Sequence, residues 1–133
     1  MAAYYQLIGR DTDTSGKVTA PYHATILAQG AWNEHEQHMA PATGIICAEL
    51  DQFTPRGDMR IGRISLDILG LIPAGEFSIT TQVIRPGKTI ELIESEMMAG
   101  GKTCMVARTW RMMIQNSQLI KGLEDADAAG PEN

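Results

Sequence analysis

The sequence predicts one α+β domain in which a curved antiparallel sheet wraps around a single buried helix. From residue 59 onward, segments of alternating apolar and polar residues are separated by turns rich in Gly and Pro, which is typical of antiparallel strands joined by short connections. Before them, residues 39–53 form a stretch with apolar residues on most sides, which predicts a buried helix. An antiparallel sheet needs its apolar face covered, and this helix is the strongest cover that the sequence offers.

Four long strands are expected in the second half of the chain. They fall in RIGRISLDIL, FSITTQVIR, TIELIESEMM and TCMVARTWRMMI, separated by IPAGE, RPGK and AGGK. The first should point Leu66 toward the helix and Asp67 away from it. The apolar face of the last is expected to consist of Cys104, Val106, Trp110, Met112 and Ile114. We therefore predict a four-stranded meander, with YYQLI and KVTA near the N-terminus as edge strands.

The helix is predicted to run from Met39 to about Phe53. Pro41 suits the first turn, where its missing N–H costs nothing, and TPRGD ends the helix. Gly44 weakens a helix by ~1 kcal/mol relative to alanine, so it should have a packing or functional reason. The whole arrangement, a short N-terminal β region, one helix and four wrapping strands, is the hotdog architecture.

Composition limits the classes of protein that fit. The 133 residues make one domain, expected over residues 1–120, followed by an acidic flexible tail or linker start over residues 121–133. No apolar run is long enough to span a bilayer, and the N-terminus does not resemble a secretory signal. The net charge of −5 and the lack of a basic, aromatic cluster argue against nucleic-acid binding. Cys47 and Cys104 form no CxxC pair, which favours a reducing compartment, the cytoplasm.

From about Gly30 to Met113 the chain resembles the N-terminal hotdog of the acyl-CoA thioesterase II-like (TesB-like) family. The matching stretches, in order, are GAWNEHEQH, RISLDILGLIPAGEF, TTQVIRPGKTIELIESEMMAGGKT and VARTWRMM. This resemblance implies hydrolysis of an acyl-CoA thioester by an activated water. It requires no metal, redox cofactor or covalent intermediate.

Some positions depart from the family pattern. Relatives tend to open the helix with His-Gly-Gly, where this chain has His38-Met39-Ala40, and Cys47 stands where single-hotdog thioesterases carry an acid. In double-hotdog enzymes the catalytic Asp belongs to the second hotdog. The alternative is therefore a non-catalytic acyl-CoA-binding or structural hotdog that needs a second hotdog for activity. A hydratase is less supported, because no paired Asp/His motif is seen on a helix.

The two histidines of HEQH could have several roles. His35 and His38 do not form the H-E-x-x-H motif and no second cluster completes four ligands, so no metal site is expected. His38 either caps the helix or lines a pocket at its first turn. There the free backbone N–H groups could polarise the thioester carbonyl.

Each candidate catalytic side chain also has a structural reading. Asp67 is either a solvated or interface carboxylate or a base that activates water across a dimer contact. Glu49 and Asp51 lie near the helix C-terminus and are read as structural or surface residues. No base is expected within reach of the Cys47 thiol, so we interpret Cys47 as a small buried core residue rather than as a nucleophile. By elimination, Asp67 acting in trans, with His38 at the oxyanion end, is the predicted catalytic pair.

Substrate contacts are expected at both ends of the bound acyl-CoA. Ala42, Thr43 and Gly44 should line the pocket beside the first helical turns, while Arg85 and Lys88 either bind the CoA phosphates or remain solvated. The eight methionines form either an acyl tunnel or simply the core. Because a hotdog sheet has open edges, we predict a homodimer joined edge to edge, or pairing with a second hotdog.

Overall fold

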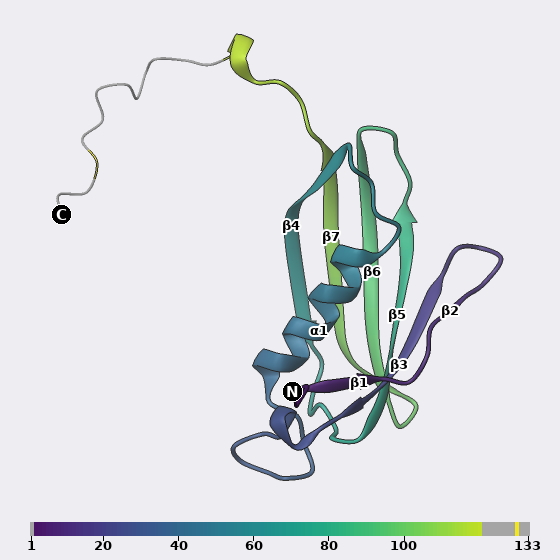
Figure 1. Ribbon diagram of the computed structural model, residues 1–133, viewed down its shortest axis with the longest axis vertical. Helices are drawn as coiled ribbons and strands as arrows, with labels where there is room; N and C mark the ends of the chain where they lie inside the picture. The colour runs from purple at the N-terminus through teal and green to yellow at the C-terminus, as the bar shows by residue number, and fades with distance from the viewer. Residues whose placement is uncertain (1, 121–129, 131–133) are drawn as a thin grey trace.

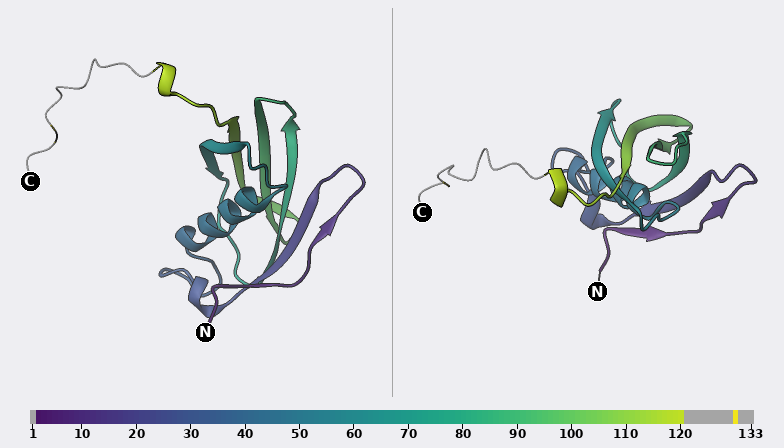
Figure 2. Two further views of the ribbon diagram at one scale, coloured as in Figure 1. Left: turned by 45° about the horizontal axis from the view of Figure 1, so that its top comes forward. Right: turned by 90° about the horizontal axis from the view of Figure 1, so that it is seen from above.

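The computed structural model describes residues 2–120 and residue 130. One helix, α1 (Met39–Gln52), lies against the inner face of a seven-stranded antiparallel sheet that curls around it (Figures 1 and 2). This confirms the predicted α+β architecture. The strands are β1 (Tyr5–Leu7), β2 (Asp11–Thr12), β3 (Val18–Ala24), β4 (Met59–Ile68), β5 (Glu76–Arg85), β6 (Ile90–Ala99) and β7 (Lys102–Met113), with short 3-10 turns at Ile26–Ala28 and Gln118–Ile120. The predicted tail over residues 121–133 lies outside the described residues except for residue 130.

The order of the strands corrects one prediction. The sheet runs β1-β3-β5-β6-β7-β4, with β2 also paired to β3, so β5, β6 and β7 form a meander but β4 pairs with β7. The connection after β4 is no hairpin: it crosses under the start of α1, where Gln37 N–H donates to Ile72 O and Ala74 N–H to His35 O. This crossover carries the chain from one edge to β5. For the same reason KVTA belongs to an interior strand, β3, and only YYQLI lies at an edge.

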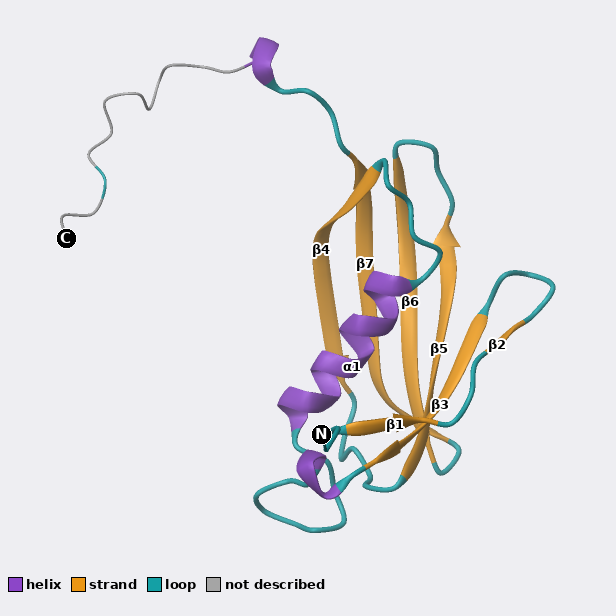
Figure 3. Ribbon diagram, in the orientation of Figure 1, coloured by secondary structure: helices purple, strands orange, loops and turns teal. Residues whose placement is uncertain are grey.

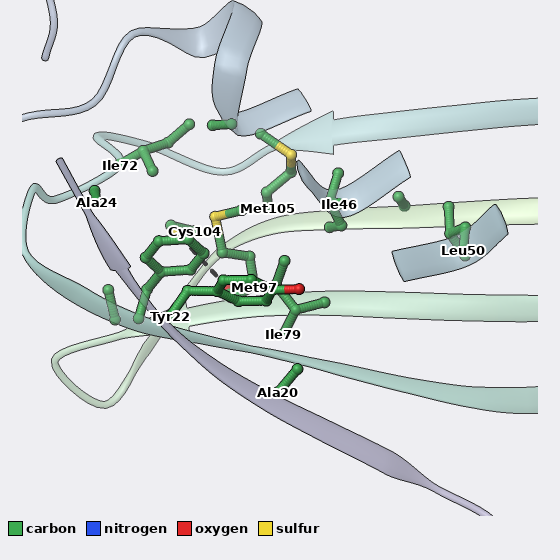
Figure 4. Packing of buried hydrophobic residues seen from close by; sticks show 14 of the residues in the cluster. Ala20, Tyr22, Ala24, Ile46, Leu50, Ile72, Ile79, Met97, Cys104 and Met105 are labelled. Atoms are coloured by element: carbon green, nitrogen blue, oxygen red, sulfur yellow. Dashed lines mark hydrogen bonds between the residues drawn. The ribbon is translucent and has the colours of Figure 1, made fainter. Parts of the chain in front are cut away.

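The core forms where one stripe of α1 meets the centre of the sheet. Ala42, Ile46 and Leu50 are fully buried on the helix, and strands β5, β6 and β7 present Ile79, Ile93, Met97 and Met105 to them (Figure 4). Each large side chain buried in this way stabilises the fold by about 1.5–3 kcal/mol. Met97 is therefore a core residue, and Cys104 lies beside it with its thiol donating to Met97 O over 3.4 Å.

The inner face of β7 differs from the prediction. Val106 and Trp110 are half-buried and Met112 is exposed, whereas Met105, Ala107, Thr109 and Arg111 are buried beside Cys104. A register shift against β6 between Met97 and Met98 lets both Cys104 and Met105 point inward, which inverts the alternation that follows. The predicted face was thus wrong beyond Cys104, and a buried arginine replaces an expected apolar residue.

A long loop joins the first 3-10 turn to α1. Isolated bridges pair Gln29 with Gln37 and Glu36 with Pro73, so the base of this loop is fixed to the crossover after β4 (Figure 3). The tip holds Trp32, whose side chain is 94% exposed. The start of the helix therefore lies in a frame built from two segments that are far apart in the sequence, the loop before α1 and the crossover after β4.

Candidate active site and ligand pockets

The first turn of α1 holds an unused backbone donor. His38 is the N-cap, and its Nδ1 accepts a hydrogen bond from Ala40 N–H over 3.2 Å, so the predicted capping role is confirmed. Pro41 has no N–H, and Ala42 N–H donates to His38 O. Within the described residues, Met39 N–H is left without an acceptor in this turn. Together with the positive end of the helix dipole it forms a small site for developing negative charge.

Gln37 holds the backbone before the helix in place. Its side chain is buried, accepts from Tyr5 Oη–H over 2.9 Å and donates through Nε2 to Pro73 O over 2.9 Å. Burial raises the pKa of Tyr5 well above its usual value, so the phenol remains a donor. His38 N–H also donates to Ala28 O over 2.7 Å. The donor of Met39 is thus rigidly oriented, as electrostatic stabilisation of a transition state requires.

An apolar hollow opens beside this turn. It has a volume of about 430 Å³, which is in the range of small-molecule pockets. Small residues of the outward face of α1 form its floor, and two tyrosines of the N-terminal segment form a wall. The lining residues are Tyr4, Tyr5, Ala40, Pro41, Gly44, Ile45 and Ala48. A methyl group added at Gly44 would meet no atom within 4 Å, so glycine there keeps the floor open.

The three predicted pocket residues of α1 do not share one position. Gly44 is exposed in the hollow, Thr43 is half-buried on a neighbouring face, and Ala42 is fully buried in the core. A ligand on the surface of the helix would therefore meet Gly44 and Thr43 rather than the side chain of Ala42.

Asp67 lies on the free edge of the sheet, near the end of β4. Leu66 packs against the core, so the alternation of the strand turns Asp67 to the opposite, exposed face. No contact joins Asp67 to His38 within the described part of the chain. The same edge exposes Ile64, Ile68, Leu69 and Leu71, which are between 39% and 59% accessible. The unpaired backbone groups of an exposed edge strand can pair with a strand of another chain.

The acidic and thiol groups inside α1 are held in non-catalytic settings. Glu49 is 1% exposed and receives both ends of the Arg10 guanidinium, at 2.7 and 2.8 Å, as well as hydrogen bonds from the Tyr22 hydroxyl and Gln52. Burial, followed by the hydrogen bond to Glu49, raises the pKa of Tyr22 to about 12. Burial also raises the pKa of the Cys47 thiol, which keeps it protonated and a poor nucleophile. The structural interpretation of Glu49 is confirmed, because this buried carboxylate is bound by Arg10, Tyr22 and Gln52 through four hydrogen bonds.

A polar pocket of about 310 Å³ lies at the opposite end of α1, between the loop after the helix and the start of β4. Arg111 of β7 is buried there; its Nη1 donates to the carbonyls of Phe53 and Thr54, and its Nη2 lies 2.5 Å from a Glu91 oxygen. Arg56 lies 3.7 Å from the other Glu91 oxygen and donates to the carbonyls of Gly87 and Lys88. The turn between β5 and β6 is thereby fixed to this pocket.

The described residues contain no group of three or more His, Cys, Asp or Glu side chains that could hold a metal ion. His35 is 82% exposed at its side chain and contacts Glu34, away from His38. None of the described helices has the length and apolar character needed to cross a membrane.

Comparison with known proteins identifies the family. A sequence model of the acyl-CoA thioesterase N-terminal domain matches residues 28–112, which include α1, β4, β5, β6 and all of β7 but its last residue. The chain belongs to this family. Its members are hotdog thioesterase domains, so the predicted coarse family is confirmed. A search of curated protein sequences finds no match.

Solved structures share the fold of this domain at low sequence identity. The PaaI protein of the phenylacetic acid degradation operon of E. coli superposes with a TM-score of 0.65 at 16% identity, covering 84% of this chain and 80% of that one. A phenylacetic acid degradation-related protein of Ralstonia eutropha gives 0.65 at 17% identity, with 82% and 84% covered. A Bacillus halodurans protein solved with CoA gives 0.63 at 10% identity, with 82% and 75% covered. The single-hotdog fold is thus confirmed.

Several residues of the sites were missed by sequence reasoning. Three of them are buried polar residues in segments predicted to be a loop or strands: Gln37, Glu91 and Arg111. Their spacing in the sequence gives no indication that they are buried. Glu49 did carry a signal, because it follows Ala42 and Ile46 on one helical stripe and so had to be buried. A buried carboxylate needs a partner, which would have pointed to an arginine such as Arg10.

Proposed function

We propose that this domain hydrolyses acyl-CoA thioesters, as a TesB-like hotdog does, by attack of an activated water. The observation that carries the proposal is the first turn of α1, where the unpaired Met39 N–H lies beside an apolar hollow. The thioester carbonyl would accept from Met39 N–H, and the acyl group would occupy the hollow. As water attacks, the carbonyl oxygen gains negative charge, which the donor and the helix dipole stabilise more strongly than the neutral ground state.

The base that takes the proton from water would come from a second chain. Among the described residues, no carboxylate forms a hydrogen bond or ion pair with the first turn. Glu49, the buried acid of α1, already accepts hydrogen bonds from Arg10 and Tyr22. We propose a homodimer joined through β4, the bare apolar edge, with Asp67 contributed across the junction. In place of a second copy of this chain, a second hotdog domain could pair with the β4 edge in the same way. His38 would line the oxyanion end while holding Ala40 N–H, and Lys88 and Arg85 would lie on the CoA side.

A mixing experiment tests this arrangement. Asp67→Asn keeps the shape of the side chain and should lower the rate of acyl-CoA hydrolysis about 10²–10⁴-fold. Met39→Pro removes the proposed oxyanion donor at a helical position that tolerates proline, and should lower the rate about 10²–10³-fold. After subunit exchange, a mixture of the two variants should recover about a quarter of the wild-type rate, because half of the dimers then hold one intact site.

The controls separate the possible results. Asp11→Asn removes an exposed carboxylate on the far edge of the sheet and should leave the rate unchanged. Full activity of Asp67→Asn would reject this base, and failure of the mixture to recover would reject its action in trans.

The competing function is an acyl-CoA-binding domain without turnover. It is favoured by Cys47, which occupies the helical position where single-hotdog enzymes carry an acid. Binding of acyl-CoA by the wild type, with no hydrolysis across a panel of acyl groups, would select this second function.

A further inference from the structure

Positive charge gathers at one end of an otherwise acidic molecule. The chain carries a net charge of −5, yet the end formed by the loop after α1, the start of β4 and the turn between β5 and β6 is rich in basic side chains (Figure 1, top). These are Arg56, Arg60, Arg85, Lys88 and Arg111, against Asp51, Asp58 and Glu91. An anionic ligand would be attracted to this end and repelled by the rest of the surface.

The pocket at this end offers guanidinium donors that are not all used. Its lining includes Arg56, Arg60 and Arg111, with Asp51 as the one acid. Arg111 is 5% exposed, and its Nε–H has no acceptor among the described residues although both of its terminal nitrogens are engaged; Oε1 of Glu91, which lies beside Nη2, likewise forms no hydrogen bond. A buried donor without a partner is costly and commonly marks the place of an unseen group.

Arg60 supplies the free charge of the pocket. It is exposed on β4, and its guanidinium forms no ion pair or hydrogen bond within the described part of the chain. Glu91 holds Arg111 and Arg56 in fixed positions, at 2.5 and 3.7 Å, rather than competing for Arg60. The guanidinium fork matches the paired oxygens of a phosphate.

We propose that this pocket binds the phosphate groups at the nucleotide end of CoA, an inference that rests on the proposed function. The geometry fits one extended ligand, because the 14 residues of α1 place the pocket about 21 Å from the first turn of the helix. The pantetheine arm of CoA joins a thioester to a pyrophosphate over a comparable length. Thus α1 spaces the reacting carbonyl from the phosphates. The basic residues Arg85 and Lys88, carried by the turn that Arg56 fixes, complete the positive end.

Binding measurements on a single surface variant test this pocket. Arg60→Gln retains the length of the side chain and removes the charge, and because Arg60 is exposed the variant should fold normally. Isothermal titration calorimetry with CoA should show an affinity lowered on the order of 10-fold, since a charge-assisted hydrogen bond is lost. The affinity for pantetheine, which has no phosphate, should not change. Lys17→Gln makes the same change of charge on the remote turn before β3 and should bind CoA as the wild type does.

Four results would overturn the proposal. The first is equal affinity of Arg60→Gln and wild type for CoA, and the second is no binding of CoA by the wild type. The third is an equal loss for CoA and pantetheine, which would mean that phosphate is not what Arg60 recognises. The fourth is binding of adenosine 3′,5′-bisphosphate as tight as that of CoA, which would assign the pocket to free nucleotides.

These measurements do not depend on turnover. A wild type that binds CoA through Arg60 but hydrolyses no thioester would refute the proposed function alone. Hydrolysis with unchanged CoA affinity in Arg60→Gln would refute the phosphate pocket alone.

Discussion

At its N-terminus α1 is capped by the exposed side chain of His38, whereas just after its C-terminus the buried Arg111 of β7 donates hydrogen bonds to the carbonyls of the C-cap Phe53 and of Thr54. The first end leaves Met39 N–H without a partner in the described chain. The second end ties Phe53, Thr54 and Glu91 together beneath the surface. The helix thus has an open end, with a free backbone donor, and a closed end, which Arg111 ties to the sheet although its Nε–H has no acceptor among the described residues.

The difference between the two ends suggests that they serve different purposes, one for the stability of the fold and the other for the proposed reaction. The C-terminus of a helix carries partial negative charge, and the cation of Arg111 lies buried beside it, on the carbonyls of Phe53 and Thr54. Backbone donors at a helix N-terminus carry partial positive charge, and His38 satisfies one of them, while Met39 N–H has no partner in the described chain. The closed end should therefore dominate stability and the open end should dominate activity.

Breaking the closed end should have the largest effect on stability. Arg111→Ala leaves Glu91 buried with only the more distant Arg56 and removes the donor to the carbonyls of Phe53 and Thr54. We expect the free energy of unfolding to fall by about 3–5 kcal/mol, measured by urea denaturation. Arg60→Ala removes an exposed arginine from the neighbouring strand and should change it by less than about 0.5 kcal/mol. A loss below about 1 kcal/mol in Arg111→Ala would show that the closed end is not a main source of stability.

A smaller loss is expected between the two ends, where Glu49 fixes the N-terminal segment to α1. Glu49→Ala leaves the Tyr22 hydroxyl buried without its acceptor, but Arg10 is about one-third exposed and can turn to water. We expect a loss of about 2–3 kcal/mol in urea denaturation. Protease cleavage before β3 should also become faster. The matched control is Glu76→Ala, an exposed acid on β5. Unchanged cleavage in Glu49→Ala would show that β1 and β2 hold the segment by themselves.

The open end should yield the smallest change in stability. His38→Ala removes the cap of Ala40 N–H and should lower the free energy of unfolding by about 1 kcal/mol. His35→Ala, three residues earlier in the exposed loop, should have no measurable effect. His38→Asn restores a capping oxygen and should recover the stability. A destabilisation by His38→Ala as large as that of Arg111→Ala would contradict the contrast between the two ends.

The fold could be predicted because its strongest signals are local. Met39 to Phe53 has the apolar content, Pro41 and the flanking breakers of a helix, and the AGGK turn holds Gly100 and Gly101 at positive φ, as a tight hairpin requires. The pairing of β4 could not be predicted, because it depends on a crossover of residues 69–75 whose hydrogen bonds reach the distant segment 35–37. A short connection favours a hairpin, but for β4 and β5 the contacts of the connection with segment 35–37 favour the crossover instead.

The candidate site was predictable in part for the same reason. A capping role was one of the two interpretations predicted for His38, because capping is a relation between neighbours in the sequence. Arg111 was assigned to neither face of its strand in advance, since its burial depends on Glu91 from β6 and on carbonyls from the end of α1. Polar pairs between residues far apart in the sequence produce no periodic pattern, so they cannot be predicted from hydrophobic periodicity.

The placement of β4 beside β7 also has a kinetic consequence. Strands β5, β6 and β7 are joined by short turns and can pair with little loop entropy to overcome. For β4, the pairing partner is the last strand to be made, and the loop that must close contains both intervening strands. Contacts of such high sequence separation slow folding. The strand that carries Asp67 and forms the free edge thus depends on the completed hairpins, and the surface that we propose for a second chain forms only after the rest of the sheet exists.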